Sequence, residues 1–425
     1  MTIRSPYRRL VGQLRHALVG GPPGDEDHNI WNWYVSTAMV GIIDGGMWVF
    51  LPVFLARLGA SPGLLGLHSS LPALLSILFL VPAGALVERV RDQLPAMVRL
   101  GLVTRVSYLL VILAPFFVPG PYLPLFIVAV WALKTIPDAG AMTLWTSIAG
   151  RAVSPRRRAH VNGTRWALLS LTSALSQAVF GRWLDGGPFP GRYQMVFAVS
   201  LVAAVADLGF FSRLHIPRLV PEERDAARAT LGQRLRAYVQ PLAEHRPFVR
   251  YLAATFVYRV LLNLPTALFT LLWVRELQAS DSLIGLRGSV GYGTLVLGYL
   301  VWGRQANRLG HRRVLRLGAV GTACYVICSA LVPSAGWLVP VAVLWGATVS
   351  GIDVGLFDLM LDACPRGKET RFASVALVAA NLGMFAGPLL GVALANATSV
   401  RTAMIIAGVL QILATAPFAL LPKDV

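Results

Sequence analysis

LGASPGLLGLHSS, at residues 58–70, returns as LQASDSLIGLRGS at residues 277–289, with Leu, Ala, Ser, Leu, Gly, Leu and Ser at matching positions. The offset between the two copies is 219 residues throughout, close to half of the 425-residue chain. A repeat of this kind indicates duplication. In each copy a serine, Ser61 or Ser280, precedes an apolar run, and serine is a preferred N-cap residue. The stretch therefore predicts two equivalent halves, each with a helix that begins at this point.

The composition of the chain is that of a membrane protein. Hydrophobic residues make up 56% of it, charged residues 14%, and the mean hydropathy is +0.63. A helix needs about 20 apolar residues to cross a bilayer, and runs of that length recur along nearly the whole sequence. We predict an all-α polytopic membrane protein whose twelve transmembrane helices form two pseudo-symmetric six-helix bundles. The twelve runs are 30–55, 63–86, 98–118, 122–149, 161–183, 194–212, 248–275, 282–303, 313–332, 336–361, 371–395 and 401–421.

These spans divide the chain into five parts. They are an N-terminal segment with a basic amphipathic helix (1–29), a first bundle (30–212), a linker with a surface helix (213–247), a second bundle (248–421) and a short tail (422–425). No stretch is left for a soluble catalytic domain, and no nucleophile–base pair, phosphate loop or metal-ligand spacing stands out. We therefore expect neither an enzyme nor a cofactor or metal site.

The net charge of +18 raises the question of where the basic residues lie. Most of them fall in the two termini and the even-numbered connections, which is the distribution of the positive-inside rule. This predicts an inner-membrane protein with both termini in the cytoplasm. The cluster Arg156-Arg157-Arg158 is then explained by orientation, and nucleic acid is not expected as a partner.

In each half one charged segment follows the second helix: GALVERVRDQLP at 84–95 in the first half and GRQANRLGHRR at 303–313 in the second. Both begin with glycine, which lets helix ends approach closely, and both carry charges that can pair when that side of the protein is closed. We interpret them as a cytoplasmic gate; orientation charges alone are the alternative. The predicted gate residues are Gly84, Glu88, Arg89, Gly303, Asn307, Arg308, Arg312, Arg313, Asp358 and Asp362.

The second of these segments resembles the signature of the major facilitator superfamily (MFS): a glycine, three residues, an Asp-Arg pair, then glycine and basic residues. Asn307 stands where the family prefers Asp, and Glu88 takes that place in the first half. The twelve spans, the six-plus-six duplication and the central linker extend the resemblance over the whole chain. It implies an MFS-fold secondary transporter that works by alternating access, a small-molecule substrate, and a cavity lined by helices 1, 4, 7 and 10.

Ionisable side chains deep in a span are costly and usually face a bundle interior or a water-filled path. Most of those in this chain fall in spans 1, 4, 7 and 10, which the resemblance implies line the cavity, and in transporters built from two halves binding sites lie near the midplane where the halves meet. Asn263 stands 219 residues after Asp44, so the first half has a titratable group where the second has an amide. The predicted coupling and cavity residues are Asp44, Lys134, Asp138, Arg259, Asn263 and Asp353.

The stretch WALKTIPDAGAM, residues 131–142, places Lys134 and Asp138 in an otherwise apolar span. One hypothesis is that Asp44 and Asp138 hold Lys134, and that a proton or substrate bound by an aspartate releases one contact. The alternative is an inert structural pair, since the two residues are four apart on one helix. The segment also partly resembles the fourth-helix signature of proton-coupled family members, with Lys134 at its arginine position.

Four cavity acids, with Asp358 included, face two bases, so a neutral or cationic organic substrate is favoured over an anion. Trp48, Asp44 and Asn263 are the predicted substrate-binding residues. Gly383, Gly387 and Gly391 form a small-residue run in span 11, for which helix packing is preferred and export is an open alternative. We predict a monomer that takes protons as the coupling ion. An uncoupled facilitator or lipid flippase of the same fold, and a receptor or membrane enzyme, are the alternatives.

Overall fold

The computed structural model describes residues 24–87, 90–216, 245–365 and 369–421, together with the isolated positions 19 and 232. Most of the expected N-terminal amphipathic helix, most of the linker with its surface helix, and the tail at 422–425 lie outside the described residues. We call residues 24–216 the first half and residues 245–421 the second half.

The first half contains six membrane-crossing segments, two of which are interrupted. In chain order they are α2 (Asp25–Ile43) with η1 (Asp44–Trp48) and α3 (Val49–Arg57); α4 (Pro62–Val87); α5 (Gln93–Phe117); α6 (Leu123–Leu133) with α7 (Thr135–Ala152); α8 (Pro155–Asp185); and α9 (Gly191–Phe211). The short 3-10 helix η2 (Gly120–Tyr122) lies in the hairpin between α5 and α6.

The second half repeats this arrangement. Its segments are α11 (Arg246–Asn263) with α12 (Thr266–Leu271) and η4 (Leu272–Glu276); α13 (Asp281–Leu309); α14 (His311–Leu331); α15 (Leu338–Ala363), preceded by η5 (Ala335–Trp337); α16 (Glu369–Ala397); and α17 (Val400–Leu413) with η6 (Ala416–Leu420). The predicted fold, twelve membrane-crossing helices in two bundles of six, is confirmed.

Eleven of these segments are both long enough and apolar enough to cross a membrane. The twelfth is α8, which has 31 residues and therefore a length of about 46 Å. Its polar residues Ser173 and Gln177 are buried in the protein, so its low mean hydropathy does not put these groups in contact with lipid.

The repeated stretch starts equivalent helices in the two halves. Ser61 Oγ accepts a hydrogen bond from the Leu64 amide before α4, and Ser280 Oγ accepts one from the Leu283 amide before α13, each at 3.3 Å. Each serine satisfies an amide that has no partner inside its helix. The helix start predicted at Ser61 and at Ser280 is therefore confirmed in both copies.

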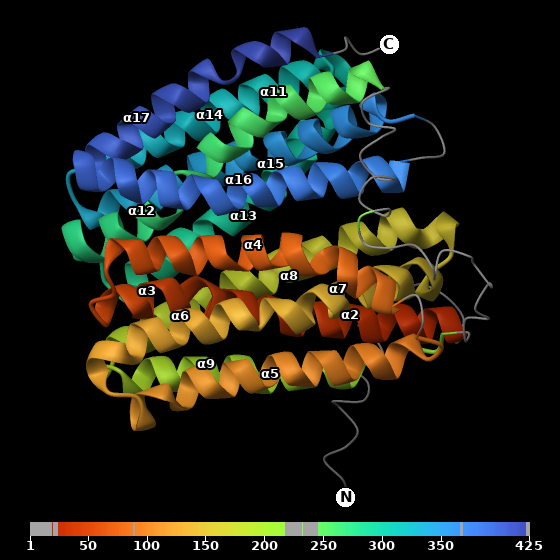
Figure 1. The fold of residues 1–425 in the computed structure, drawn as a ribbon, viewed down its shortest axis with the longest axis horizontal. Coiled ribbons are helices and arrows are strands. Elements are labelled where there is room, and N and C mark those ends of the chain that lie inside the picture. Colours follow the sequence, from red (N-terminus) through yellow and green to blue (C-terminus); the bar gives the residue numbers. More distant parts are fainter. Residues whose placement is uncertain are drawn as a thin grey trace, which may run out of the picture.

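The two halves lie one above the other in Figure 1, and α4 lies beside α16 there. A second large contact between the halves is made by α8 and α13, and smaller contacts join α12 and η4 to α3 and α12 to α4. Helix α2 begins on the right of the view, which we call the terminus side, and α3 lies at the opposite end, the far side. Helix α3 ends at Arg57, which bonds to Asp281 at the start of α13. Both interfaces thus join a helix of one half to a helix of the other.

Glycines allow close approach of helices both between the halves and within the second half. A Cβ at Gly285 of α13 would lie 2.2 Å from the backbone oxygen of Gln177 in α8. In α16, a Cβ at Gly387 would lie 2.6 Å from the Val260 oxygen and one at Gly391 2.1 Å from the Leu264 oxygen. The small-residue run of span 11 therefore packs against the seventh span.

Three helix interruptions fall at the middle of spans 1, 4 and 7. The π-helix η1 lies one turn before Pro52, and α6 ends at Leu133, four residues before Pro137. Proline has no amide hydrogen and its ring displaces the carbonyl four residues earlier, so each proline weakens the helix at these points. The seventh span breaks at Leu264 and Pro265. Because Asn263 is the equivalent of Asp44, spans 1 and 7 lose regularity at corresponding positions.

Candidate substrate site and gates

Asp44 opens the π-helix of the first span and reaches both halves. Ser173 Oγ of α8 donates a hydrogen bond to Asp44 Oδ2, and Gln177 Nε2 donates to Ser173 Oγ at 3.0 Å. The side chain of Tyr292, on α13 of the second half, also interacts with the Asp44 carboxylate. A titratable group therefore lies at the α8–α13 boundary, and π-helical turns are often found at functional sites of this kind.

Lys134 lies at the junction of α6 and α7 and pairs within its own span. Its Nζ is 2.6 Å from Asp138 Oδ2, and Asp138 Oδ1 accepts a hydrogen bond of 2.9 Å from Thr104. The ammonium also lies 4.5 Å from the centre of the Trp131 ring, a cation–π contact. Among the described contacts of Lys134 the carboxylate partner is Asp138, whereas Asp44 has Ser173 and Tyr292. The structure therefore does not bring the expected group of three together in this state.

The second half places its charged residues at equivalent positions. Asp353, which stands 219 residues after Lys134, accepts a hydrogen bond of 2.7 Å from the Tyr299 hydroxyl of α13. Arg259 of α11 lies close enough to Asp353 to interact electrostatically. Asn263 Nδ2 donates to the backbone oxygen of Arg259 at 2.8 Å. Helices α11, α13 and α15 therefore share one polar cluster. Arg259 and Asp353, both predicted from the sequence as cavity residues, belong to it.

Trp48 is exposed in a stretch of helix that is otherwise enclosed. It is 44% exposed, whereas Leu55, seven residues later on the same helix face, and Phe54 are 0% exposed. Neighbouring protein therefore surrounds the helix beyond Trp48 on the far side. Met142 of α7 and Phe357 of α15, at equivalent helices, are also exposed, by 58% and 59%.

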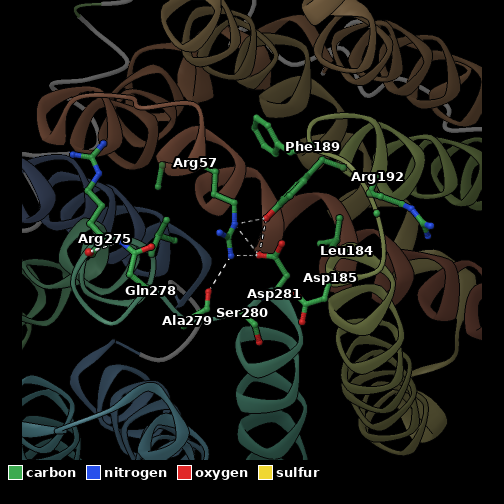
Figure 2. A pocket seen from close by; sticks show the side chains of 14 residues that line it. Arg57, Leu184, Asp185, Phe189, Arg192, Arg275, Gln278, Ala279, Ser280 and Asp281 are labelled. Atoms are coloured by element: carbon green, nitrogen blue, oxygen red, sulfur yellow. Dashed lines mark hydrogen bonds and ion pairs between the residues drawn. The ribbon is translucent and has the colours of Figure 1, made fainter.

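A polar network joins the halves on the far side (Figure 2). Arg57 donates to Asp281 Oδ1 from Nε at 3.0 Å and from Nη2 at 2.8 Å, and Tyr193 donates to the same oxygen at 2.7 Å. Arg57 Nη2 also donates to the Ala279 oxygen at 2.9 Å. The Asp281 side chain is only 7% exposed. We call Arg57, Tyr193, Asp185 and Asp281 the far-side lock, because they connect spans 1, 5 and 6 to span 8.

Asp185 completes the far-side lock from the end of α8. Its two carboxylate oxygens accept hydrogen bonds from the amides of Asp281 and Ser282 at 2.8 and 3.0 Å. A carboxylate at a helix N-terminus is favoured both by the free amides and by the helix dipole. The lock residues line a cavity of about 540 Å³ with Arg192 and Arg275 at its edges (Figure 2).

The predicted cytoplasmic gate residues make contacts within one half where they are described. Glu88 and Arg89 lie outside the described residues, as does the side chain of Asn307. Arg312 donates to the Leu421 oxygen at 3.3 Å, and Asp358 pairs with His311 at 2.8 Å. Gly84 belongs to α4 and Gly303 to α13, and no atom lies within 4 Å of a Cβ built at Gly303. Arg308, Arg313 and Asp362 are exposed.

Sequence reasoning missed the far-side lock and the tyrosines. The predicted site residues are charges in the middle of spans, whereas Arg57 and Asp281 stand at span ends. Tyr193, Tyr292 and Tyr299 are uncharged and common in membrane helices, so they gave no signal. The one signal in the sequence is a difference between the two copies of the repeat, because Asp281 in the second copy stands at the position of Pro62 in the first.

Comparisons with known proteins agree with this architecture. The profile of the Major Facilitator Superfamily matches residues 33–274 and 251–425. The structure of the nucleoside transporter NupG is similar with a TM-score of 0.69, at 10% identity over 94% of this chain and 99% of that one. No curated protein sequence matches the chain.

Two further solved structures are similar over the full length. A D-xylose-proton symporter has a TM-score of 0.69 and 12% identity, covering 94% of this chain and 97% of its own. The human organic anion transporter MFSD10 has a TM-score of 0.65 and 16% identity, covering 95% and 100%. Likeness at such identities shows the fold, and the substrates named belong to those proteins.

Proposed function

Because the chain belongs to the Major Facilitator Superfamily, we propose that it is a secondary transporter that moves a small neutral or cationic organic molecule by alternating access, coupled to protons. The observation that carries the proposal is the far-side lock. It joins the two halves on one side of the membrane, while Trp48 and Asp353 stay exposed near the middle of their spans. A closed far side with accessible mid-span groups is one of the two states that alternating access requires.

The charge distribution supports an orientation. The basic residues concentrate on the terminus side, so we assign that side to the cytoplasm. Arg157 there pairs with Asp27 at 2.7 Å, and His311 pairs with Asp358, each within one half. The structure then corresponds to a state closed to the outside. Both halves of the pathway lie in one chain, so we expect a monomer to be sufficient.

Asp44 is the proposed proton acceptor. Its carboxylate bonds to Ser173 of its own half and interacts with Tyr292 of the other half. Protonation removes the charge that holds these groups, so it weakens a contact between α8 and α13. Lys134 and Asp138 are the proposed second element, since a cation bound by Asp138 competes with Lys134 for the carboxylate. An uncoupled facilitator or a flippase would show no response to pH.

The test measures the opening of the far side without a known substrate. Spin labels at Tyr122→Cys and Trp337→Cys, one on the hairpin of each half, are introduced after Cys324, Cys328 and Cys364 are replaced by serine. We expect two distances by double electron–electron resonance, with the longer one more populated at low pH. Asp44→Asn should raise the long-distance fraction and remove its pH dependence.

The control is Glu276→Gln, which removes a carboxylate from the far side within the second half. It should keep the pH response of the parent. A single distance at every pH contradicts alternating access, and an Asp44→Asn variant that responds to pH like the parent contradicts the role of Asp44.

A further inference from the structure

The contacts and the exposure of Trp48 point to the kind of ligand that it binds. The indole Nε1 donates to the Tyr108 hydroxyl at 3.1 Å, and the Tyr108 ring stacks on Trp131 with centroids 5.8 Å apart and an angle of 22°. Tyr108 is buried. The edge of the Trp48 ring is therefore fixed to a stacked aromatic pair in which Tyr108 is buried and Trp131 partly buried, while 44% of Trp48 stays accessible. A fixed, open indole face favours a flat ring as its partner.

The charges beside this indole are unequally accessible. The Lys134 side chain is 10% exposed, because it is covered by Asp138 and by the face of Trp131, whereas the Asp138 side chain is 35% exposed. The part of the cluster that a ligand meets is thus a carboxylate and an aromatic ring. Lys134, the buried partner, is poorly placed to bind an anion.

The second half presents the same two kinds of group. Asp353 is exposed, and Phe357, one turn later on α15, is 59% exposed. These positions are equivalent to Lys134 and Asp138 by the 219-residue offset. With Asp358 paired to His311, the mid-span cluster holds the acids Asp44, Asp138 and Asp353 against the bases Lys134 and Arg259. Three negative charges against two positive charges leave one negative charge for the substrate to neutralise.

Resting on the proposed transport function, we propose that the substrate is a planar aromatic amine that carries one positive charge. Its ring stacks on Trp48, and its ammonium bonds to the carboxylate of Asp138 or Asp353. Both halves then contact one ligand, so binding of the ligand connects the two halves at mid-span. Tyr108 and Trp131 are positioning residues, since they hold the indole and are not required to touch the ligand.

Three probes of similar size separate the ring from the charge. Tryptamine has an aromatic ring and an ammonium, 2-cyclohexylethylamine has the ammonium without an aromatic ring, and indole-3-acetate has the ring with a negative charge. Binding to the purified chain in detergent is measured by isothermal titration calorimetry. We expect tryptamine to bind at least tenfold more tightly than either control. Equal affinity for tryptamine and 2-cyclohexylethylamine, or no binding of tryptamine, overturns the proposal.

Variants test the two proposed ligand contacts separately, the stacking on Trp48 and the bond of the ammonium to Asp138 or Asp353. Trp48→Leu should weaken tryptamine binding about tenfold, a typical loss for a partly desolvated cation–π and stacking contact. Trp166→Leu, at a 63% exposed tryptophan of α8, is the matched control and should bind as the parent does. Asp138→Asn combined with Asp353→Asn should abolish the preference for tryptamine over indole-3-acetate. Equal affinities for Trp48→Leu and Trp166→Leu contradict the stacking role.

The spin-label pair at Tyr122 and Trp337 distinguishes the two levels of the argument. It reports the fold and the opening of each variant independently of ligand. If tryptamine does not bind while the two distances still respond to pH, the aromatic-amine class is wrong and the transport cycle stands. If only one distance is observed at all pH values, the transport cycle itself is wrong.

Discussion

Removal of the charge of Asp281 should open the far side. In Asp281→Asn the side chain keeps its size, but a neutral amide oxygen replaces the charged carboxylate oxygen to which Arg57 donates two hydrogen bonds and Tyr193 donates one. Hydrogen bonds to charged groups contribute about 1.5–3 kcal/mol each, and the loss of one partner of a buried ion pair costs more. Arg57 is 27% exposed and keeps its bond to Ala279, so we take about 2 kcal/mol as the loss from the closed state.

A loss of about 2 kcal/mol changes the equilibrium between closed and open states about thirtyfold. If the closed state exceeds the open state about a hundredfold in the parent, the ratio in Asp281→Asn falls to about three to one. The long-distance fraction of the Tyr122 and Trp337 spin-label pair would then rise from about 1% to about a quarter. Arg57→Ala should change the fraction in the same direction.

Glu276→Gln provides the matched control. It breaks the Arg401–Glu276 pair, which has an N–O distance of 2.9 Å and lies on the far side but within the second half. This variant should leave the distance distribution as it is in the parent. If Asp281→Asn also leaves it unchanged, or if Glu276→Gln opens the far side to the same extent, the ion pair between the halves is not what keeps this side closed.

Two further predictions concern the packing of the helices. Gly285→Ala places a Cβ 2.2 Å from the Gln177 oxygen, and overpacking of this kind costs about 1–3 kcal/mol of stability, so the melting temperature in detergent should fall. Gly63→Ala is the control and should leave the melting temperature unchanged, because the atom nearest to its Cβ is 3.8 Å away. Arg105 and Asp207 form an ion pair inside the first half, with an N–O distance of 2.8 Å. Asp207→Asn leaves the Arg105 guanidinium without a carboxylate partner and should cost about 3–5 kcal/mol of stability. The double variant Asp207→Asn with Arg105→Leu should recover part of that loss in the same melting experiment; no recovery would show that the ion pair is not the cause.

The sequence by itself determined the spans, their division into two halves and the helix starts at Ser61 and Ser280. These features depend on neighbours along the chain, because a helix in a bilayer must satisfy its backbone hydrogen bonds within its own residues. The mid-span positions of Asp44 and Lys134 were predictable for the same reason. So was the Lys134–Asp138 pair, which follows from helical spacing alone.

Only the tertiary structure decided which groups meet across helices. Asp44 bonds to Ser173, 129 residues away, and Arg57 to Asp281, 224 residues away. Such partners depend on the rotation and tilt of each helix, which are set by packing against several neighbours together. The exposure of Trp48 is of the same kind, since an indole in an apolar span has the same sequence signal whether it faces lipid, protein or a water-filled space. The far-side lock could not be predicted for this reason, although its three charged residues, Arg57, Asp185 and Asp281, are evident in the sequence.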